Sequence, residues 1–99
     1  MMYQLLFRDR AVDEMQDAYN WYEEQVTGLG DKFIAVVKNN IDIILRNPKS
    51  FKTSYKNFKE VFIRKFPFII VYYIDDSKRA VVIMSVFHSS RNPKRKYKN

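Results

Sequence analysis

Hydrophobic and polar residues follow two different periods along the chain, and these periods predict a first strand, two helices and then three further strands. Over residues 12–26 apolar side chains return every three or four positions, which predicts an amphipathic helix capped by Asp9. The apolar stripe consists of Val12, Met15, Ala18, Tyr19, Trp21, Tyr22 and Val26. The opposite side is polar and is expected to face solvent through Asp13, Asp17, Asn20 and Glu24.

A second helix is predicted after a break at residues 27–30, where both glycines of the chain lie. Its apolar face is formed by Phe33, Val36, Val37, Ile41, Ile44 and Leu45. The helix should end at Asn47, because the residue before a proline is pushed out of the helical region by Pro48. Two amphipathic helices joined by a short loop are expected to form an antiparallel hairpin.

Short runs of apolar and aromatic residues predict strands at residues 3–7, 61–64, 66–74 and 80–87, with a turn at 75–78. Residues 49–59 show no clean period and are predicted to be a loop or a partly ordered connector. The order predicts one α+β domain over residues 1–99, with an N-terminal strand and an antiparallel helical hairpin packed on a mostly antiparallel β-sheet. Residues 89–99 are expected to form a basic C-terminal tail that is free to move.

Charge is divided unevenly along the chain, whose net charge is +7. Residues 1–45 hold 4 basic and 8 acidic residues, a net of −4, whereas residues 46–99 hold 14 basic and 3 acidic residues, a net of +11. A basic half of this kind indicates an anionic partner, either nucleic acid or an acidic protein segment.

Composition excludes several classes of function. With no cysteine and one histidine, the chain lacks the ligands for zinc, and two glycines are too few for a phosphate-binding loop, so no metal or cofactor is expected. No apolar run is long enough for a signal peptide or a membrane span. We therefore expect a cytoplasmic protein without a membrane partner.

Three residues are the main candidates for chemistry. His88 follows a strand that is expected to be buried, and a histidine can exchange protons near neutral pH, although a structural hydrogen-bonding role is the commoner one. Arg64 interrupts an apolar strand and suits phosphate or carboxylate, with a salt bridge to Glu60 or to a helix carboxylate as the alternative. Arg91 stands three residues beyond His88.

A second set of candidates is basic and aromatic. Lys56 and Lys59 lie among aromatic residues in "FKTSYKNFK", a composition that can stack on nucleobases or simply cover the edge of a core. The tail adds Lys94, Arg95 and Tyr97, which are expected to assist binding electrostatically.

Several segments taken together resemble the RelE/ParE family of toxins from bacterial type II toxin–antitoxin systems. They are "AVDEMQDAYNWYEEQ", "GLGDKF", "RNP", "FIRKFPFIIVYYI" and "VFHSSRNP", and the resemblance runs from about Phe7 to Pro93. It implies the toxin of a plasmid-stabilisation system, a growth inhibitor that a cognate antitoxin neutralises by covering its working surface.

The two branches of the family imply different targets. The ParE-like branch, which the "WYEEQ…GLG" and "VFHSSRNP" segments favour slightly, poisons DNA gyrase and needs no catalytic residue of its own. The RelE-like branch cuts mRNA on the ribosome without a metal, and there the resemblance would make Arg64 and His88 catalytic, with Arg91, Tyr97, Lys56 or Lys59 assisting. Several RelE-like members carry a tight Lys-x-Lys pair, whereas Asn57 and Phe58 separate the lysines here. A non-toxic binding module on the same fold is the third possibility, so enzyme activity stays open.

Overall fold

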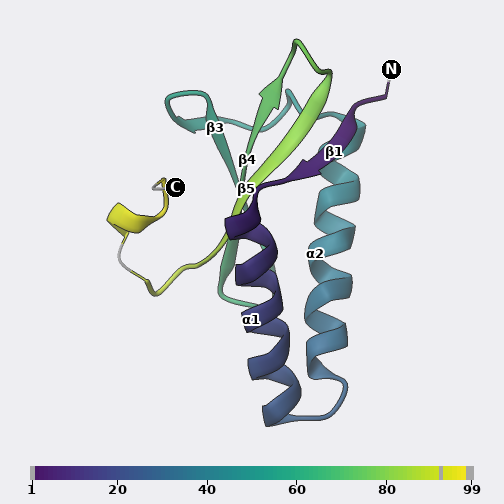
Figure 1. Ribbon diagram of the computed structural model, residues 1–99, viewed down its shortest axis with the longest axis vertical. Coiled ribbons are helices and arrows are strands. Elements are labelled where there is room, and N and C mark those ends of the chain that lie inside the picture. The colour runs from purple at the N-terminus through teal and green to yellow at the C-terminus, as the bar shows by residue number, and fades with distance from the viewer. Residues whose placement is uncertain (1, 92, 98–99) are drawn as a thin grey trace.

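Five strands form one sheet in the order β1-β5-β4-β3-β2, and two helices cover one of its faces (Figure 1). The computed structural model describes residues 2–91 and 93–97. The elements are β1 (Gln4–Phe7), α1 (Asp9–Gln25), α2 (Leu29–Arg46), β2 (Thr53–Tyr55), β3 (Phe58–Phe62), β4 (Phe68–Asp75), β5 (Ala80–His88) and a 3₁₀ turn η1 (Pro93–Arg95). β1 pairs with β5 in parallel, and the other neighbours are antiparallel. The predicted α+β class is therefore confirmed.

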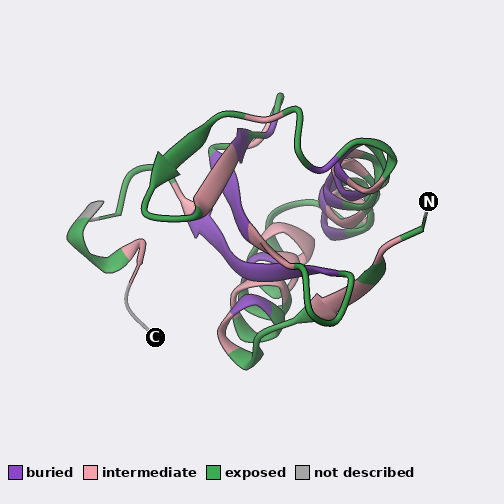
Figure 2. Ribbon diagram, turned by 90° about the horizontal axis from the view of Figure 1, so that it is seen from above, coloured by how far each residue is buried: buried purple, intermediate pink, exposed green. Residues whose placement is uncertain are grey.

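The main core lies between the helices and the inner face of the sheet. α2 contributes Phe33, Val37, Ile41 and Ile44, and the sheet contributes Ile70, Tyr72, Val81, Ile83 and Val86. Tyr22 and Phe33 pack against Phe66 and Phe68 with ring centroids 4.9 to 6.3 Å apart, which closes the core at the end of the helical hairpin. Figure 2 shows buried residues concentrated on the central strands and on the helix sides that face them.

α1 meets the sheet through small residues rather than through its whole apolar stripe. Ala11 and Ala18 are buried, whereas Val12, Trp21 and Val26 are 51%, 56% and 61% exposed. These three residues of the predicted apolar stripe are therefore not covered by the core, because close packing on alanine leaves the flanks of the stripe exposed. Asp9 is the first helical residue and Arg8 occupies the cap position, so the predicted Asp9 cap is displaced by one residue.

The helical hairpin is closed by a carboxylate and two glycines. Glu23 of α1 accepts hydrogen bonds from the backbone N–H groups of Gly28 and Gly30 at 2.9 to 3.1 Å, which satisfies donors at the start of α2. Gly28 has a φ of +91°, a conformation that favours glycine. A Cβ at Gly30 would lie 2.7 Å from the Tyr19 carbonyl oxygen, so the absence of a side chain lets the helices approach.

The segment predicted to be a connector contains an edge hairpin. β2 lies within residues 49–59, and β3 begins at Phe58 and ends at Phe62, before Arg64. Residues of β2 are all exposed, which is why no alternating pattern marks it in the sequence. Pairing of β3 with β4, from Lys59 opposite Tyr72 to Phe62 opposite Ile69, fixes its position instead.

Among the described residues, neither helix has the length and hydrophobicity that a bilayer-crossing segment needs.

Candidate functional site

A β-bulge in the middle of β5 is the feature around which the candidate site is built. Opposite β4, Ser85 pairs with Val71 and Ile83 pairs with Tyr72, so Met84 is an extra residue in β5. Glu14 of α1 approaches this point from the side. Its Oε1 accepts hydrogen bonds from the Ser85 hydroxyl at 2.7 Å and from the Val86 N–H at 3.0 Å.

Arg10 extends this contact from α1 to the C-terminal residues. Its Nε lies 3.2 Å from Oε2 of Glu14, and its guanidinium lies 5.9 Å from the centre of the Phe87 ring. The same guanidinium donates a hydrogen bond of 2.7 Å to the carbonyl oxygen of Arg95. The first turns of α1 therefore hold both the end of β5 and the segment that follows it.

His88 is the last residue of β5 and is half-buried, with its ring edge against Phe68 at 4.9 Å between centroids. Nδ1 accepts a hydrogen bond from the Ser90 backbone N–H at 3.1 Å, and the Ser90 hydroxyl lies 2.6 Å from the same nitrogen. A backbone N–H can only donate, so Nδ1 carries no proton in this arrangement and the neutral ring holds its proton on Nε2.

His88 and Arg91 line one groove beside the end of β5. The other lining residues are Glu14, Asp17, Ala18, Trp21 and Tyr22 of α1, with Phe68, Val86 and Ser90. The cavity has a volume of about 420 Å³. Its aromatic walls can hold an apolar side chain of a partner, and Asp17 and Arg91 supply one charge of each sign at its rim.

Arg64 lies in the turn between β3 and β4 and is exposed. Backbone hydrogen bonds from Ile63 to Phe68 and from Ser89 to Pro67 bring this turn to the same end of the sheet as His88. Arg64 is nevertheless not among the residues that line the groove. The alternative salt bridge to Glu60 is not formed, because Glu60 is paired with Lys96 at 2.9 Å.

Tyr97 lies elsewhere, on the outer face of the sheet. Tyr97 packs against Tyr55 and Phe58 with centroids 4.6 and 5.4 Å apart, and its hydroxyl donates a hydrogen bond to Glu60. It also covers a small apolar cluster made of Ile69, Val71 and Met84. The tail predicted at residues 89–99 is thus held against the sheet as far as Tyr97, while residues 92, 98 and 99 lie outside the described residues. Its freedom to move stays a prediction.

Electrostatics stabilise the charged form of Glu60 beneath the tail. Burial acts to raise the pKa of this carboxyl, but hydrogen bonds from Tyr97 and Lys96, with the Lys96 charge, outweigh it and lower the pKa. Burial, followed by the bond to Glu60, raises the pKa of the Tyr97 hydroxyl. The contact is therefore strongest with Glu60 ionised and Tyr97 neutral.

The basic candidates serve different purposes. Lys59 donates hydrogen bonds to the Phe51 carbonyl oxygen at 2.6 Å and to the Thr53 hydroxyl at 3.1 Å, so it ties β3 to the start of β2. Lys56 stands in the β2–β3 turn with a φ of +50° and lies 5.5 Å from the Tyr55 ring centre. Lys94 and Arg95 are exposed on η1. None of these four lines the groove of His88 and Arg91.

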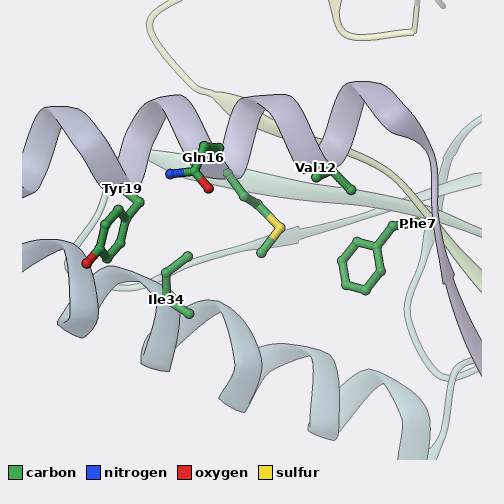
Figure 3. Close-up of a pocket in the computed structure, with 6 residues that line it drawn as sticks. Phe7, Val12, Gln16, Tyr19 and Ile34 are labelled. Atoms are coloured by element: carbon green, nitrogen blue, oxygen red, sulfur yellow. The ribbon is translucent and has the colours of Figure 1, made fainter.

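A second, apolar groove between α1 and α2 was missed by the sequence reasoning (Figure 3). It has a volume of about 370 Å³ and is lined by Phe7, Val12, Met15, Gln16, Tyr19 and Ile34. The signal in the sequence is the width of the α1 stripe, which is broader than the sheet can cover.

Comparisons with solved structures show which fold the chain has. The fold is similar to the chromosomal ParDE toxin–antitoxin system of P. aeruginosa, with a TM-score of 0.76, 11% identity, and coverage of 88% of this chain and 96% of that chain. It is also similar to a mutant of the E. coli toxin RelE in complex with a RelBc antitoxin peptide, with a TM-score of 0.69, 21% identity, and coverage of 96% and 90%. At these identities the likeness shows the fold alone, which is the fold of RelE/ParE toxins.

The sequence then gives the family. Residues 5–93 match the family described as the ParE toxin of the type II toxin–antitoxin system parDE, and the chain therefore belongs to the ParE toxin family. No protein with a curated description matches the sequence. The resemblance to RelE/ParE toxins inferred from sequence segments is confirmed.

Proposed function

We propose that this toxin poisons DNA gyrase and that a cognate antitoxin holds it inactive until it is released. The observation that carries the proposal is the match to the ParE family over residues 5–93, which spans the groove and both His88 and Arg91. In this proposal the groove binds a protein surface, and no residue of the toxin performs a chemical step.

The shape and lining of the groove support a protein partner. Trp21, Tyr22 and Phe68 provide aromatic walls, and side chains of this kind are enriched where protein interfaces draw most of their binding energy.

The charge of the chain supports a partner that is bound to DNA. Residues 46–99 carry a net charge of +11, which favours approach to a complex of gyrase with its polyanionic substrate.

An antitoxin partner is supported by the structural neighbours, since ParDE and the intact E. coli RelBE complex are toxin–antitoxin assemblies. An acidic antitoxin segment would complement the basic half of this chain. An antitoxin held by charge would then dissociate more readily at high salt than one held by apolar contacts.

A RelE-like cleavage of mRNA is the second candidate, because the structure brings Arg64, His88 and Arg91 to one end of the sheet. In that reaction the 2′-hydroxyl gives up its proton to a water molecule and its oxygen forms a bond to phosphorus. The bond from phosphorus to the 5′-oxygen breaks, and a proton must reach that leaving oxygen. The Nε2–H of His88 could supply the proton, and the two arginines could stabilise the charge on phosphate.

Two reactions with the purified toxin separate these candidates. Gyrase, ATP and supercoiled plasmid are incubated with toxin, and protein-linked linear DNA is measured after denaturation. The second reaction supplies ribosomes that are translating a defined mRNA, and cleavage is mapped by primer extension. Linear DNA without mRNA cleavage supports the proposal, whereas mRNA cleavage without linear DNA contradicts it. Activity in neither reaction favours a non-toxic binding module.

A further inference from the structure

We infer that Glu14 is the positioning residue of the groove, because it fixes the bulged end of β5 to α1 and so holds His88 and Arg91 in place. The inference rests on the proposed function only in treating this groove as the working surface. Glu14 also lines the groove, but its carboxylate oxygens are engaged by Ser85, Val86 and Arg10, so it acts on the residues that follow Val86.

The backbone at this end of β5 has no neighbouring strand on one side. β1 pairs with β5 only at Ala80, Val81, Val82 and Ile83, so the stretch from Met84 to His88 extends beyond the partner strand. The Val86 N–H points to this open side and finds its acceptor in the Glu14 carboxylate at 3.0 Å. Edge groups of this kind must be satisfied when they are buried, because an unpaired N–H costs as much as a lost hydrogen bond.

The bulge makes the same stretch the part of β5 that needs support from outside the sheet. An extra residue at Met84 disrupts the ladder with β4 and leaves the fully buried Ser85 hydroxyl requiring a partner. Glu14 accepts from that hydroxyl at 2.7 Å. Two hydrogen bonds from consecutive residues to one oxygen set both the position and the direction of the chain as it leaves the bulge.

Only a carboxylate can make all of these contacts together. One oxygen of Glu14 accepts from the Ser85 hydroxyl and the Val86 N–H, and the other faces the Arg10 guanidinium at 3.2 Å. A carboxamide has a single acceptor oxygen, and its NH₂ group would meet the guanidinium donor to donor. Glutamine at this position should therefore keep the bonds to β5 and lose the bond to Arg10.

The connection reaches the groove within a few residues. Val86 and His88 both line the groove, and the His88 Nδ1 is held by Ser90, which precedes Arg91. On the other side, Arg10 holds the Arg95 carbonyl oxygen at 2.7 Å, so the segment after His88 is fixed at both of its ends. Loss of Glu14 should loosen this whole segment while leaving the His88 and Arg91 side chains themselves unchanged.

The test compares Glu14→Ala, Glu14→Gln and a matched control, Asp13→Ala, which removes an exposed carboxylate from the same helix. Three quantities are measured on the full-length, ¹⁵N-labelled protein: the exchange rate of the Val86 amide, the imidazole ¹⁵N shifts of His88, and gyrase-dependent DNA cleavage. Because the chain has one histidine, its ring signals are unambiguous. Thermal unfolding of each variant establishes that it is folded.

For Glu14→Ala we expect Val86 to exchange at least about tenfold faster, the His88 ring to move toward the tautomer mixture of free histidine, and DNA cleavage to fall about tenfold. Glu14→Gln should retain slow exchange at Val86 with an intermediate loss of cleavage. Asp13→Ala should match the wild-type protein in all three measurements.

A folded Glu14→Ala protein with unchanged Val86 exchange and unchanged His88 shifts would overturn the inference. If Glu14→Ala does not fold, Glu14→Gln provides the test through Val86, whose exchange should stay slow because the carboxamide oxygen keeps the bonds to β5. Fast Val86 exchange in a folded Glu14→Gln protein with unchanged His88 shifts would exclude positioning through β5. Whether gyrase is the target is a separate question. If wild-type toxin causes no DNA cleavage by gyrase, the Val86 exchange rate and the His88 shifts still decide the role of Glu14.

Discussion

The hydroxyl of Tyr72 donates a hydrogen bond of 2.6 Å to the carbonyl oxygen of Pro48, which stands 24 positions earlier in the chain. Tyr72 is fully buried in the central strand β4, and Pro48 follows the end of α2. The bond joins the end of the helical hairpin to the middle of the sheet. It also gives a buried phenol the polar partner that it requires.

Replacing Tyr72 with phenylalanine removes this donor and leaves the Pro48 carbonyl without it. We expect the free energy of unfolding to fall by about 1–3 kcal/mol, measured by urea denaturation. Tyr73→Phe is the matched control, because the Tyr73 hydroxyl receives only a 3.4 Å contact from Arg8 at the surface. That variant should change stability by less than about 0.5 kcal/mol, and an equal loss in both variants would contradict the assignment.

The same tyrosine gives a prediction for alkaline pH. Burial raises the pKa of Tyr72 to about 12, above the ordinary value of 10.0. A raised pKa means that folding favours the neutral phenol, so its contribution is complete below pH 10 and is lost as pH rises toward 12. Wild-type stability should therefore fall more steeply than that of Tyr72→Phe between these pH values. Parallel curves would show that Tyr72 ionises in the folded state as it does in solvent.

The two glycines of the hairpin should respond differently to alanine. Gly30→Ala places a methyl group 2.7 Å from the Tyr19 carbonyl oxygen and 2.9 Å from the Glu23 side chain, so we expect a loss of about 3 kcal/mol. Gly28→Ala meets no atom within 4 Å but keeps a strained φ of +91°, which costs about 1 kcal/mol. Chemical denaturation of both variants tests the order, and a smaller loss at Gly30 would disprove the close approach of the helices.

The contact of Tyr97 with the sheet should weaken in acid. The pKa of Glu60 is lowered on folding, so the stability that its charge provides is present above its ordinary value of 4.5 and is lost as pH falls below it. The Tyr97 ring signals should move toward those of an exposed tyrosine over this range. In Glu60→Gln they should be displaced already at pH 7 and should show no such transition. Ring signals of the wild-type protein that stay constant down to pH 3 would contradict the role of Glu60.

Arg91 and Arg64 distinguish a binding groove from a catalytic centre. If the groove binds gyrase, Arg91→Ala should weaken the complex about tenfold, while Arg64→Ala, outside the groove lining, should change it less. Surface plasmon resonance with immobilised gyrase measures both, with Lys38→Ala on α2 as a control for lost positive charge. A loss of all toxicity in Arg64→Ala and in His88→Ala, with gyrase binding intact, would point to the mRNA-cleavage alternative.

The pattern of apolar residues was sufficient for the helical hairpin, the β4–β5 hairpin and the order of elements. Each helix buries one apolar face, and β4 and β5 are continuous apolar runs buried on both faces. It failed for β2, whose residues are all exposed, and for the position of β3, which depends on pairing with β4. It also failed for Val12 and Trp21, since Ala11 and Ala18 decide how α1 approaches the sheet. These features depend on packing partners that local sequence does not encode.

Only part of the candidate site could be predicted from the sequence. His88 and Arg91 were each chosen as candidates from residue type and position, and both line one groove in the structure. Their function stays a prediction. Glu14 could not be found this way, because it lies 71 positions from Ser85 and looks like any other acid in an exposed helix turn. The sequence also gave no sign that Lys96 and Tyr97 would contact Glu60 across the sheet.

The central claim, that this toxin acts on gyrase, is tested most directly by pulse-labelling bacteria minutes after the toxin is induced without its antitoxin. DNA and protein synthesis are followed side by side, in a normal strain and in one with a toxin-resistant gyrase. We predict that DNA synthesis stops first while translation continues, and that the resistant strain is spared. An early stop of protein synthesis in both strains would contradict the claim.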